Sequence, residues 1–185
     1  MSTRAGKRVR AAPKSVRTSA IHEAAHAVAA VLVSQGIKRV TIVPHGNSFG
    51  HVIPRKPPRK LYEAVESGTP TPAQRAMVEG YVVYILAGPE AARRYRGRSD
   101  HIGASDDRKA VDAWMSPLEA NDDVRAAWLR YLKLRAKVFV DRHWPEINAV
   151  ADALIMRWTL SEDDVLEAIR AVSARAVRTP VRPPR

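Results

Sequence analysis

The pattern of apolar and polar positions along the chain predicts mainly α-helices. Between Ser19 and Ser34 the apolar residues recur at intervals of three and four, which places them on one face of a helix. They are Ile21, Ala24, Ala25, Val28, Ala29, Val31, Leu32 and Val33. Thr18 or Ser19 is the candidate N-cap, and Gly36 is the expected stop. The first element is therefore predicted to be a helix with a largely buried face.

Two short segments after this helix have the composition of β-strands. Residues 38–44 are rich in β-branched residues and end in a proline, and residues 50–53 contain a second apolar pair. The turn residues Gly46-Asn47-Ser48 lie between them, so we predict a two-stranded ribbon. Residues 54–71 mix four prolines with basic residues. They are predicted to form an exposed, mobile connection with at most a short helical turn around Leu61 to Val65.

Helical patterns return in the second half of the chain. Thr71-Pro72 is a favourable helix start, and the predicted helix runs to Gly88-Pro89 with a further turn or two to Tyr95. Beyond the polar stretch 97–105, helices are predicted at 106–115, 121–139, 145–158 and 161–172, the last with Ser161 and Asp164 as a capping box. The expected fold class is mainly α, with a small β-ribbon beside the first helix.

Length and composition limit the kind of protein. The chain has 185 residues, of which 45% are apolar, enough for one compact domain with a hydrophobic core. It has no cysteine, so any metal must be held by His, Asp, Glu or water. No stretch approaches the roughly 20 apolar residues of a membrane span, and the basic N-terminus lacks the apolar core of a signal peptide. We therefore expect a soluble, cytoplasmic protein.

The positive charge is concentrated at the two ends of the chain. The net charge is +12, and the ten Lys and Arg residues of segments 1–17 and 174–185 account for all but +2 of it. Both segments lack acidic residues and are predicted to be disordered basic tails that flank one domain at 18–173. Such tails are most simply solubilising, although they could bind polyanions weakly and in a salt-dependent way.

The chemistry-bearing motif of the chain is His22-Glu23-Ala24-Ala25-His26. On a helix, residues four apart lie on the same face, so His22 and His26 can present two imidazoles to one metal ion. Glu23 lies one position further round, where a carboxylate can accept a proton from a water molecule that attacks a peptide bond. The spacing therefore predicts a zinc site with Glu23 as general base.

A catalytic zinc ion usually has three protein ligands, so one more must come from elsewhere in the chain. Carboxylates at predicted helix starts are candidates, and the spacing alone does not choose among Glu90, Asp100, Asp106 and Asp107. His51 and His101 are further candidates, but a single histidine in a loop is more often a surface residue than a ligand.

Several segments resemble the FtsH-like zinc metallopeptidases, which are the peptidase domains of membrane-bound AAA proteases. AIHEAAHAVAA at 20–30 is similar to the zinc helix of that family, and KRVTIVPHGNSFGHV at 38–52 to the strands that follow it. ILAGPEAARRY at 85–95, GASDDRKA at 103–110 and WPEINAVADALIMRWTLSEDDVLEAI at 144–169 resemble later segments, in the same order. The resemblance spans about 19–172 and implies a helical zinc-peptidase domain, with Asp107 as the third ligand.

The resemblance implies a zinc-dependent metallopeptidase that cleaves unfolded or flexible polypeptides. The chain departs from the family at Ala92 and Arg93, where adjacent glutamates are usual, and at Asp106, where asparagine is usual, so Asp106 or Glu90 could replace Asp107. No ATPase module is recognised, so a separate unfoldase or adaptor would deliver folded substrates, and a homo-oligomer is possible. Two alternatives are a nucleic-acid-binding protein that acts through its basic tails, and a catalytically inactive zinc-containing interaction module.

Overall fold

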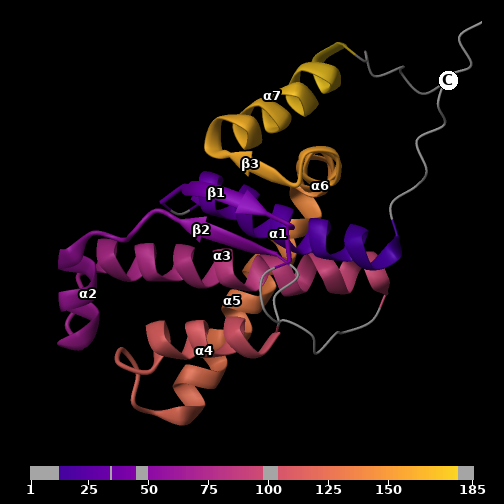
Figure 1. Cartoon of the computed structure of the whole chain (residues 1–185). Helices are drawn as coiled ribbons and strands as arrows, with labels where there is room; N and C mark the ends of the chain where they lie inside the picture. The colour runs from indigo at the N-terminus through magenta and orange to yellow at the C-terminus, as the bar shows by residue number, and fades with distance from the viewer. Residues whose placement is uncertain (1–12, 34, 45–49, 98–103, 179–185) are drawn as a thin grey trace, which may run out of the picture.

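The computed structural model describes residues 13–33, 35–44, 50–97 and 104–178. Within them the fold is mainly helical with one small antiparallel sheet, which confirms the predicted fold class (Figure 1). The elements are α1 (Lys14–Val33), β1 (Ile37–Thr41), β2 (His51–Pro54), α2 (Arg59–Glu66), α3 (Pro72–Arg96), α4 (Ala104–Met115), α5 (Asp122–Arg142), α6 (Trp144–Arg157), β3 (Thr159–Ser161) and α7 (Glu162–Arg178).

Helix α1 lies at the centre of the core, packed against α3 and α6. Its alanines are fully buried, and their small side chains allow the neighbouring helices to approach closely. At one such approach, a Cβ added to Gly80 of α3 would lie 2.5 Å from the carbonyl oxygen of Val33. A helix with this composition can therefore be buried on most of its circumference.

Helix α1 begins earlier than the Thr18 or Ser19 cap predicts. It starts at Lys14, and Arg17 forms an ion pair with Asp152 of α6 and donates a 3.2 Å hydrogen bond to Asn148. These contacts anchor an additional turn onto the body of the protein. Part of the predicted N-terminal tail is thus helical, as is the beginning of the C-terminal tail, since α7 extends to Arg178.

The predicted ribbon is present and belongs to a three-stranded antiparallel sheet with the order β2-β1-β3. Thr41 of β1 pairs with His51 on one side and with Thr159 on the other. Strand β3 was not predicted, because it has three residues and a single buried apolar side chain, Leu160. The predicted turn at 46–48 lies outside the described residues.

The segment 54–71 is mostly exposed, as predicted, but it contains a longer helix than the short turn predicted around Leu61 to Val65. Eight of its residues form α2, whose Leu61 and Val65 are buried in the core. Tyr62 of the same helix stacks on Trp114 of α4 at a centroid distance of 5.3 Å. The prolines lie on either side of this short amphipathic helix and do not interrupt it.

Helix α3 runs without a break through Pro89, where the sequence predicts an end. Proline in a helix interior removes one hydrogen bond and costs about 3 kcal/mol. The surrounding residues Ala87, Gly88 and Ala91 are buried, and this packing outweighs the local preference. Within the described residues, no helix is both long enough and apolar enough to cross a bilayer.

Three of the predicted helix starts are confirmed by their caps. Thr71 and Gln74 form a reciprocal capping box at the start of α3. The weaker box with aspartate is also present, since the Ser161 amide donates to Asp164 at 2.8 Å and the Asp164 amide donates to the Ser161 hydroxyl at 3.2 Å. Asn121, the first residue of the helix predicted at 121–139, is the N-cap of α5.

Candidate metal centre

Two imidazoles from α1 meet at the surface where α1 faces α3 and α4. His22 and His26 are one helical turn apart, and their Nε2 atoms lie 3.0 Å from each other. The His26 side chain is 7% exposed and that of His22 16%. Both rings therefore present a nitrogen to the same small volume, as the four-residue spacing predicts.

Asp107, from the first turn of α4, completes the cluster. Its Oδ2 lies 3.6 Å from His22 Nε2, and its Oδ1 lies 3.7 Å from His26 Nε2. One ligand atom from each of the three residues falls within 4.8 Å of the other two. The fold thus brings together two residues of the first helix and an aspartate that follows them by more than eighty positions.

His26 is oriented by α3 from the opposite side of its ring. Its Nδ1 lies 2.9 Å from the carbonyl oxygen of Tyr84, which can only accept, so Nδ1 carries the proton. The lone pair is then on Nε2, which faces His22 and Asp107. Gly88 lies against the same ring, and a Cβ at that position would be 2.2 Å from Nε2. The hydrogen bond and the contact with Gly88 together fix the orientation of the ring, as metal binding would require.

The cluster holds more acceptors than donors. Burial, and secondarily the adjacent His26, keeps the pKa of His22 well below its ordinary value, so this ring is neutral at pH 7. Burial also raises the pKa of Asp107, although His26 opposes the change. The buried Oδ2 of Asp107 accepts no hydrogen bond from any described residue. A buried carboxylate oxygen without a donor is costly, and a cation between these three side chains would satisfy it.

The donor set and spacing fit a tetrahedral metal ion. Zinc bonds of about 2.0–2.2 Å to nitrogen and oxygen, in tetrahedral geometry, place the ligand atoms about 3.3 Å apart. The two Nε2 atoms lie 3.0 Å apart, and the Asp107 carboxylate places Oδ2 3.6 Å from His22 and Oδ1 3.7 Å from His26, close to that value. Two imidazoles and one carboxylate also leave one coordination position for a substrate or water, as catalytic sites require.

Glu23 lies beside the cluster and is itself buried, with 8% exposure. Burial, with a smaller contribution from Asp107, raises its pKa to about 8. Gly50, at the start of β2, approaches so closely that a Cβ there would lie 2.8 Å from Glu23 Cγ and 2.8 Å from the carbonyl oxygen of Thr41. The carboxyl group is therefore held between α1 and the sheet, next to the histidines and outside the ligand set.

The other candidate ligands lie elsewhere. Glu90 forms an ion pair with Arg93 on the surface of α3, at 2.5 Å. Asp106 is 89% exposed and faces Lys109. Asp100 and His101 lie outside the described residues. Among the described candidates, Asp107 is thus the carboxylate that reaches the two histidines.

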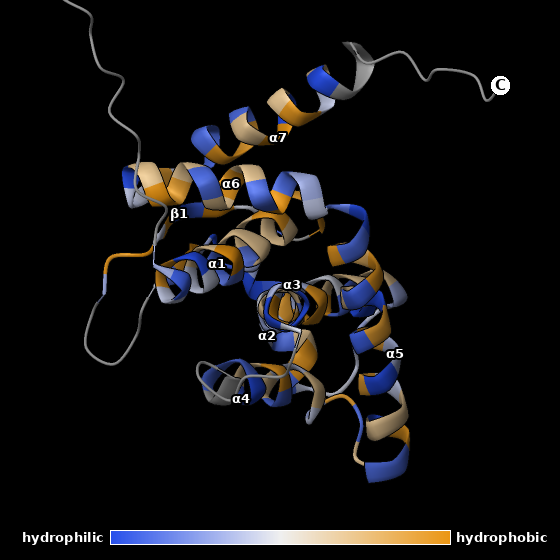
Figure 2. Ribbon diagram, turned by 90° about the vertical axis from the view of Figure 1, so that its right-hand side faces the viewer, coloured by the Kyte–Doolittle hydropathy of each residue, from blue (hydrophilic) through white to orange (hydrophobic). Residues whose placement is uncertain are grey.

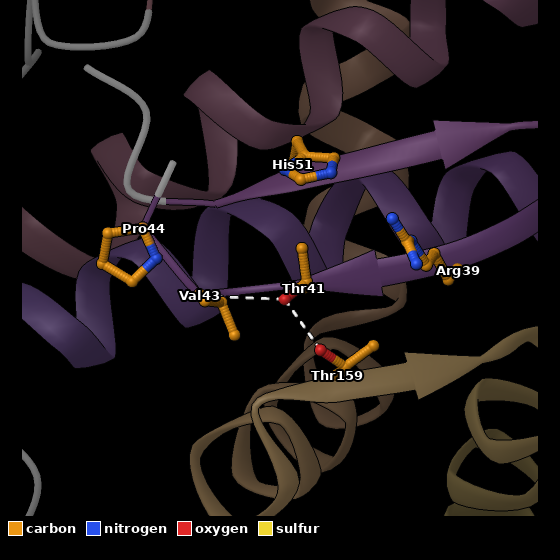
Figure 3. Close-up of a pocket in the computed structure, with 6 residues that line it drawn as sticks. All are labelled: Arg39, Thr41, Val43, Pro44, His51 and Thr159. Atoms are coloured by element: carbon orange, nitrogen blue, oxygen red, sulfur yellow. Dashed lines mark hydrogen bonds between the residues drawn. The ribbon is translucent and has the colours of Figure 1, made fainter. Parts of the chain in front are cut away.

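His51 contributes to a different feature, a shallow pocket of about 250 Å³ on the sheet (Figure 3). Its ring extends from β2 beside residues of β1 and β3, and the pocket is lined by Arg39, Thr41, Val43, Pro44, His51 and Thr159. The Thr41 hydroxyl lies 2.8 Å from that of Thr159 and links the two strands. This histidine is therefore a strand residue and does not belong to the His22, His26 and Asp107 cluster.

Sequence reasoning did not identify three residues that shape the centre. Tyr84 acts through its backbone carbonyl, which carries no side-chain signal. Gly50 and Gly88 act through the absence of a side chain, and each was assigned only to a local element, the start of a strand and the end of a helix. Their positions beside Glu23 and His26 become apparent only when α1, α3 and β2 are packed together.

No protein-family model matches this chain, and no curated protein is significantly similar to it.

Proposed function

We propose that the protein is a zinc-dependent metallopeptidase that hydrolyses peptide bonds of unfolded or flexible polypeptides. The observation that supports this most strongly is the partly buried cluster of His22, His26 and Asp107, whose spacing suits a tetrahedral ion. Glu23 adds a carboxyl group one residue from a ligand, which is the arrangement that metal-assisted hydrolysis of amides uses.

In this proposal His22 and His26 bind the metal through Nε2, and Asp107 binds it through a carboxylate oxygen. When bound, zinc supplies a Lewis acid that polarises the scissile carbonyl and makes water acidic enough to attack near neutral pH. The hydrogen bond from His26 Nδ1 to Tyr84 keeps the imidazole in the tautomer that can act as a ligand.

Glu23 is the proposed general base. Its carboxylate takes a proton from the attacking water and later passes it to the leaving amine, so that one residue serves both halves of the reaction. Burial raises its pKa to about 8 in the metal-free protein. A neighbouring cation favours the ionised form and would lower that pKa again before attack.

The substrate is proposed to lie as an extended strand along β2. Both edges of β1 are already paired in the order β2-β1-β3, so β1 cannot accept a further strand. Strand β2 begins beside Gly50, next to Glu23, and its outer edge pairs with no other described strand. Addition of a peptide to a sheet edge requires an extended chain, which explains the proposed restriction to unfolded or flexible polypeptides. Folded polypeptides would need a separate unfoldase or adaptor that delivers them in an extended form.

Metal analysis tests the first half of the proposal. Protein purified without chelator should contain close to one zinc ion per chain, and dialysed protein should take up one equivalent. Purified protein that contains no zinc and takes up none after dialysis would contradict the proposal.

Proteolysis tests the second half. Glu23→Gln should retain zinc and lose cleavage of an unfolded substrate such as casein, because it removes the base without removing a ligand. Glu90→Gln is the matched control, since Glu90 lies on the neighbouring helix outside the cluster and should retain full activity. If Glu23→Gln cleaves as fast as the parent, the activity belongs to another protein. Full zinc occupancy without cleavage by the parent would indicate an inactive zinc-containing module.

A further inference from the structure

Helix α5 has a second apolar face that is exposed to solvent. Five residues form it, spaced alternately three and four positions apart, and we call them the α5 seam: Val124, Ala127, Tyr131, Leu134 and Val138. The four large ones are 50–64% exposed. This spacing corresponds to positions a and d of a heptad over two complete repeats.

The α5 seam is not part of the core of the protein. The core-facing side of the helix is formed by Leu132, Ala136, Phe139 and Val140, which are buried. That side packs mainly against α3, and α5 is the outermost helix on its side of the molecule (Figure 2). Among the described residues, α5 therefore has one apolar face in use and another without a partner.

The width of the α5 seam favours a helix as its partner. A strict a and d pattern forms a narrow stripe, which suits knobs-into-holes packing against one other helix. Helices that lie on a membrane surface usually present a wider apolar face. The narrow stripe on α5 has charged residues directly beside it, so a bilayer would gain little contact with apolar side chains.

The charges that border the α5 seam define the partner further. Arg130 and Lys137 occupy the g positions on one side, and Arg135 and Arg142 occupy the e positions on the other. Arg135 also binds Glu79, and Lys137 binds Asp141 within the same helix. Asp123, at the start of the helix, is the one acidic residue at these e and g positions.

This charge pattern disfavours pairing of α5 with a second copy of itself. In a parallel pair, Arg130 would face Arg135 of the other copy and Lys137 would face Arg142, and an antiparallel pair would also bring basic side chains together. Like charges in facing positions oppose association. A helix with acidic residues at its e and g positions would meet complementary charges on both sides.

We propose that the α5 seam is a docking site for an amphipathic helix of a partner protein, with apolar residues at a and d and acidic residues at e and g. The site lies on α5, which contributes no residue to the metal centre. It is therefore independent of the proposed peptidase activity, and each proposal can fail without the other.

A pair of synthetic helical peptides tests the docking site with the full-length protein. One peptide of about four heptads has leucine at a and d and glutamate at e and g, and its match has lysine at e and g. Fluorescence anisotropy should show at least about tenfold tighter binding of the glutamate peptide, weakened by salt. Equal binding of the two peptides, or binding of neither, would overturn the proposal.

Two substitutions connect binding to the α5 seam. Leu134→Asp should lower the affinity for the glutamate peptide by about tenfold or more, without loss of folding because the side chain is exposed. Arg130→Glu should lower the affinity for the glutamate peptide and raise the affinity for the lysine peptide. Arg170→Glu makes the same charge change on an exposed position of α7 and should alter neither affinity. Peptide binding that survives Leu134→Asp unchanged would contradict the assignment.

Two further measurements identify the competing partners. Leu134→Asp should not change the binding of the protein to vesicles of phosphatidylcholine with phosphatidylserine. This substitution should also leave the oligomeric state unchanged in analytical sedimentation. A positive result in either measurement, without binding of the glutamate peptide, would replace the partner helix by a membrane or by a second copy of the chain.

Discussion

Substitution of Gly88 by alanine tests how the metal centre depends on α3. A Cβ at this position would lie 2.2 Å from His26 Nε2 and 2.6 Å from two ring carbons. Non-bonded carbon atoms settle about 3.5–4.0 Å apart, so the imidazole must move by more than about 1 Å. That movement is several times the roughly 0.2 Å tolerance of a metal–ligand bond, and it also strains the hydrogen bond to Tyr84.

The expected result of Gly88→Ala is a selective loss of metal affinity. Misplacement of one ligand should weaken zinc binding by about 10- to 100-fold. Crowding of the core costs about 1–3 kcal/mol of stability, and the higher helix propensity of alanine offsets about 1 kcal/mol. The variant should therefore fold, with a slightly lower melting temperature.

Competition with a chromogenic chelator measures the affinity, and circular dichroism measures the melting temperature. Gly80→Ala is the matched control, because it crowds the same helix against the Val33 carbonyl, remote from the ligands. It should destabilise the protein and leave the zinc affinity of the folded form unchanged. If Gly88→Ala binds zinc within twofold of the parent, the ring is not confined as the structure indicates.

Three further outcomes are expected. Asp107→Ala should weaken zinc binding by more than about 100-fold and Asp106→Ala by less than about twofold in a chelator competition, because only Asp107 reaches the histidines. Glu162→Ala should cost about 1–3 kcal/mol in urea unfolding at pH 7, since a backbone amide of β1 loses its acceptor. The hydrogen bonds from Arg55 hold the pKa of Glu162 below its ordinary value. The contribution of Glu162 to the free energy of unfolding is therefore present above about pH 4.5 and is lost as pH falls through the lowered pKa. The loss of stability caused by Glu162→Ala should accordingly be smaller at pH 3. Pro89→Ala should raise the free energy of unfolding by about 1–3 kcal/mol, measured in the same way, because α3 is continuous there.

The part of the centre that could be predicted from sequence is the part set by local geometry. His22 and His26 lie on one helix, and a four-residue spacing determines their relative position wherever that helix packs. Asp107 comes from a helix far along the chain, so its position depends on how α1, α3 and α4 pack. Residue types alone did not distinguish Asp107 from Glu90, Asp100 or Asp106, and only the ordered resemblance to the FtsH-like peptidases selected it.

The features that were predicted wrongly or not at all depend on tertiary packing. Strand β3 has too few residues to show an alternating pattern, and it forms because β1 offers a free edge beside it. Helix α2 follows a proline-rich segment, but burial of Leu61 and Val65 stabilises it. The local preference of Pro89 to end a helix is real, and the packing of α3 overrides it.

The pairing of β3 with β1 also affects the order in which the domain can be completed during synthesis. Strand β1 and helix α1 are synthesised before their partners β3 and α6, which lie more than a hundred residues later. Until those segments leave the ribosome, the apolar side of α1 that α6 covers is exposed in the nascent chain. The helix that carries the two histidines therefore reaches its final environment only after α6 and β3 have been synthesised, and a chaperone that shields α1 in the meantime would raise the yield of folded protein.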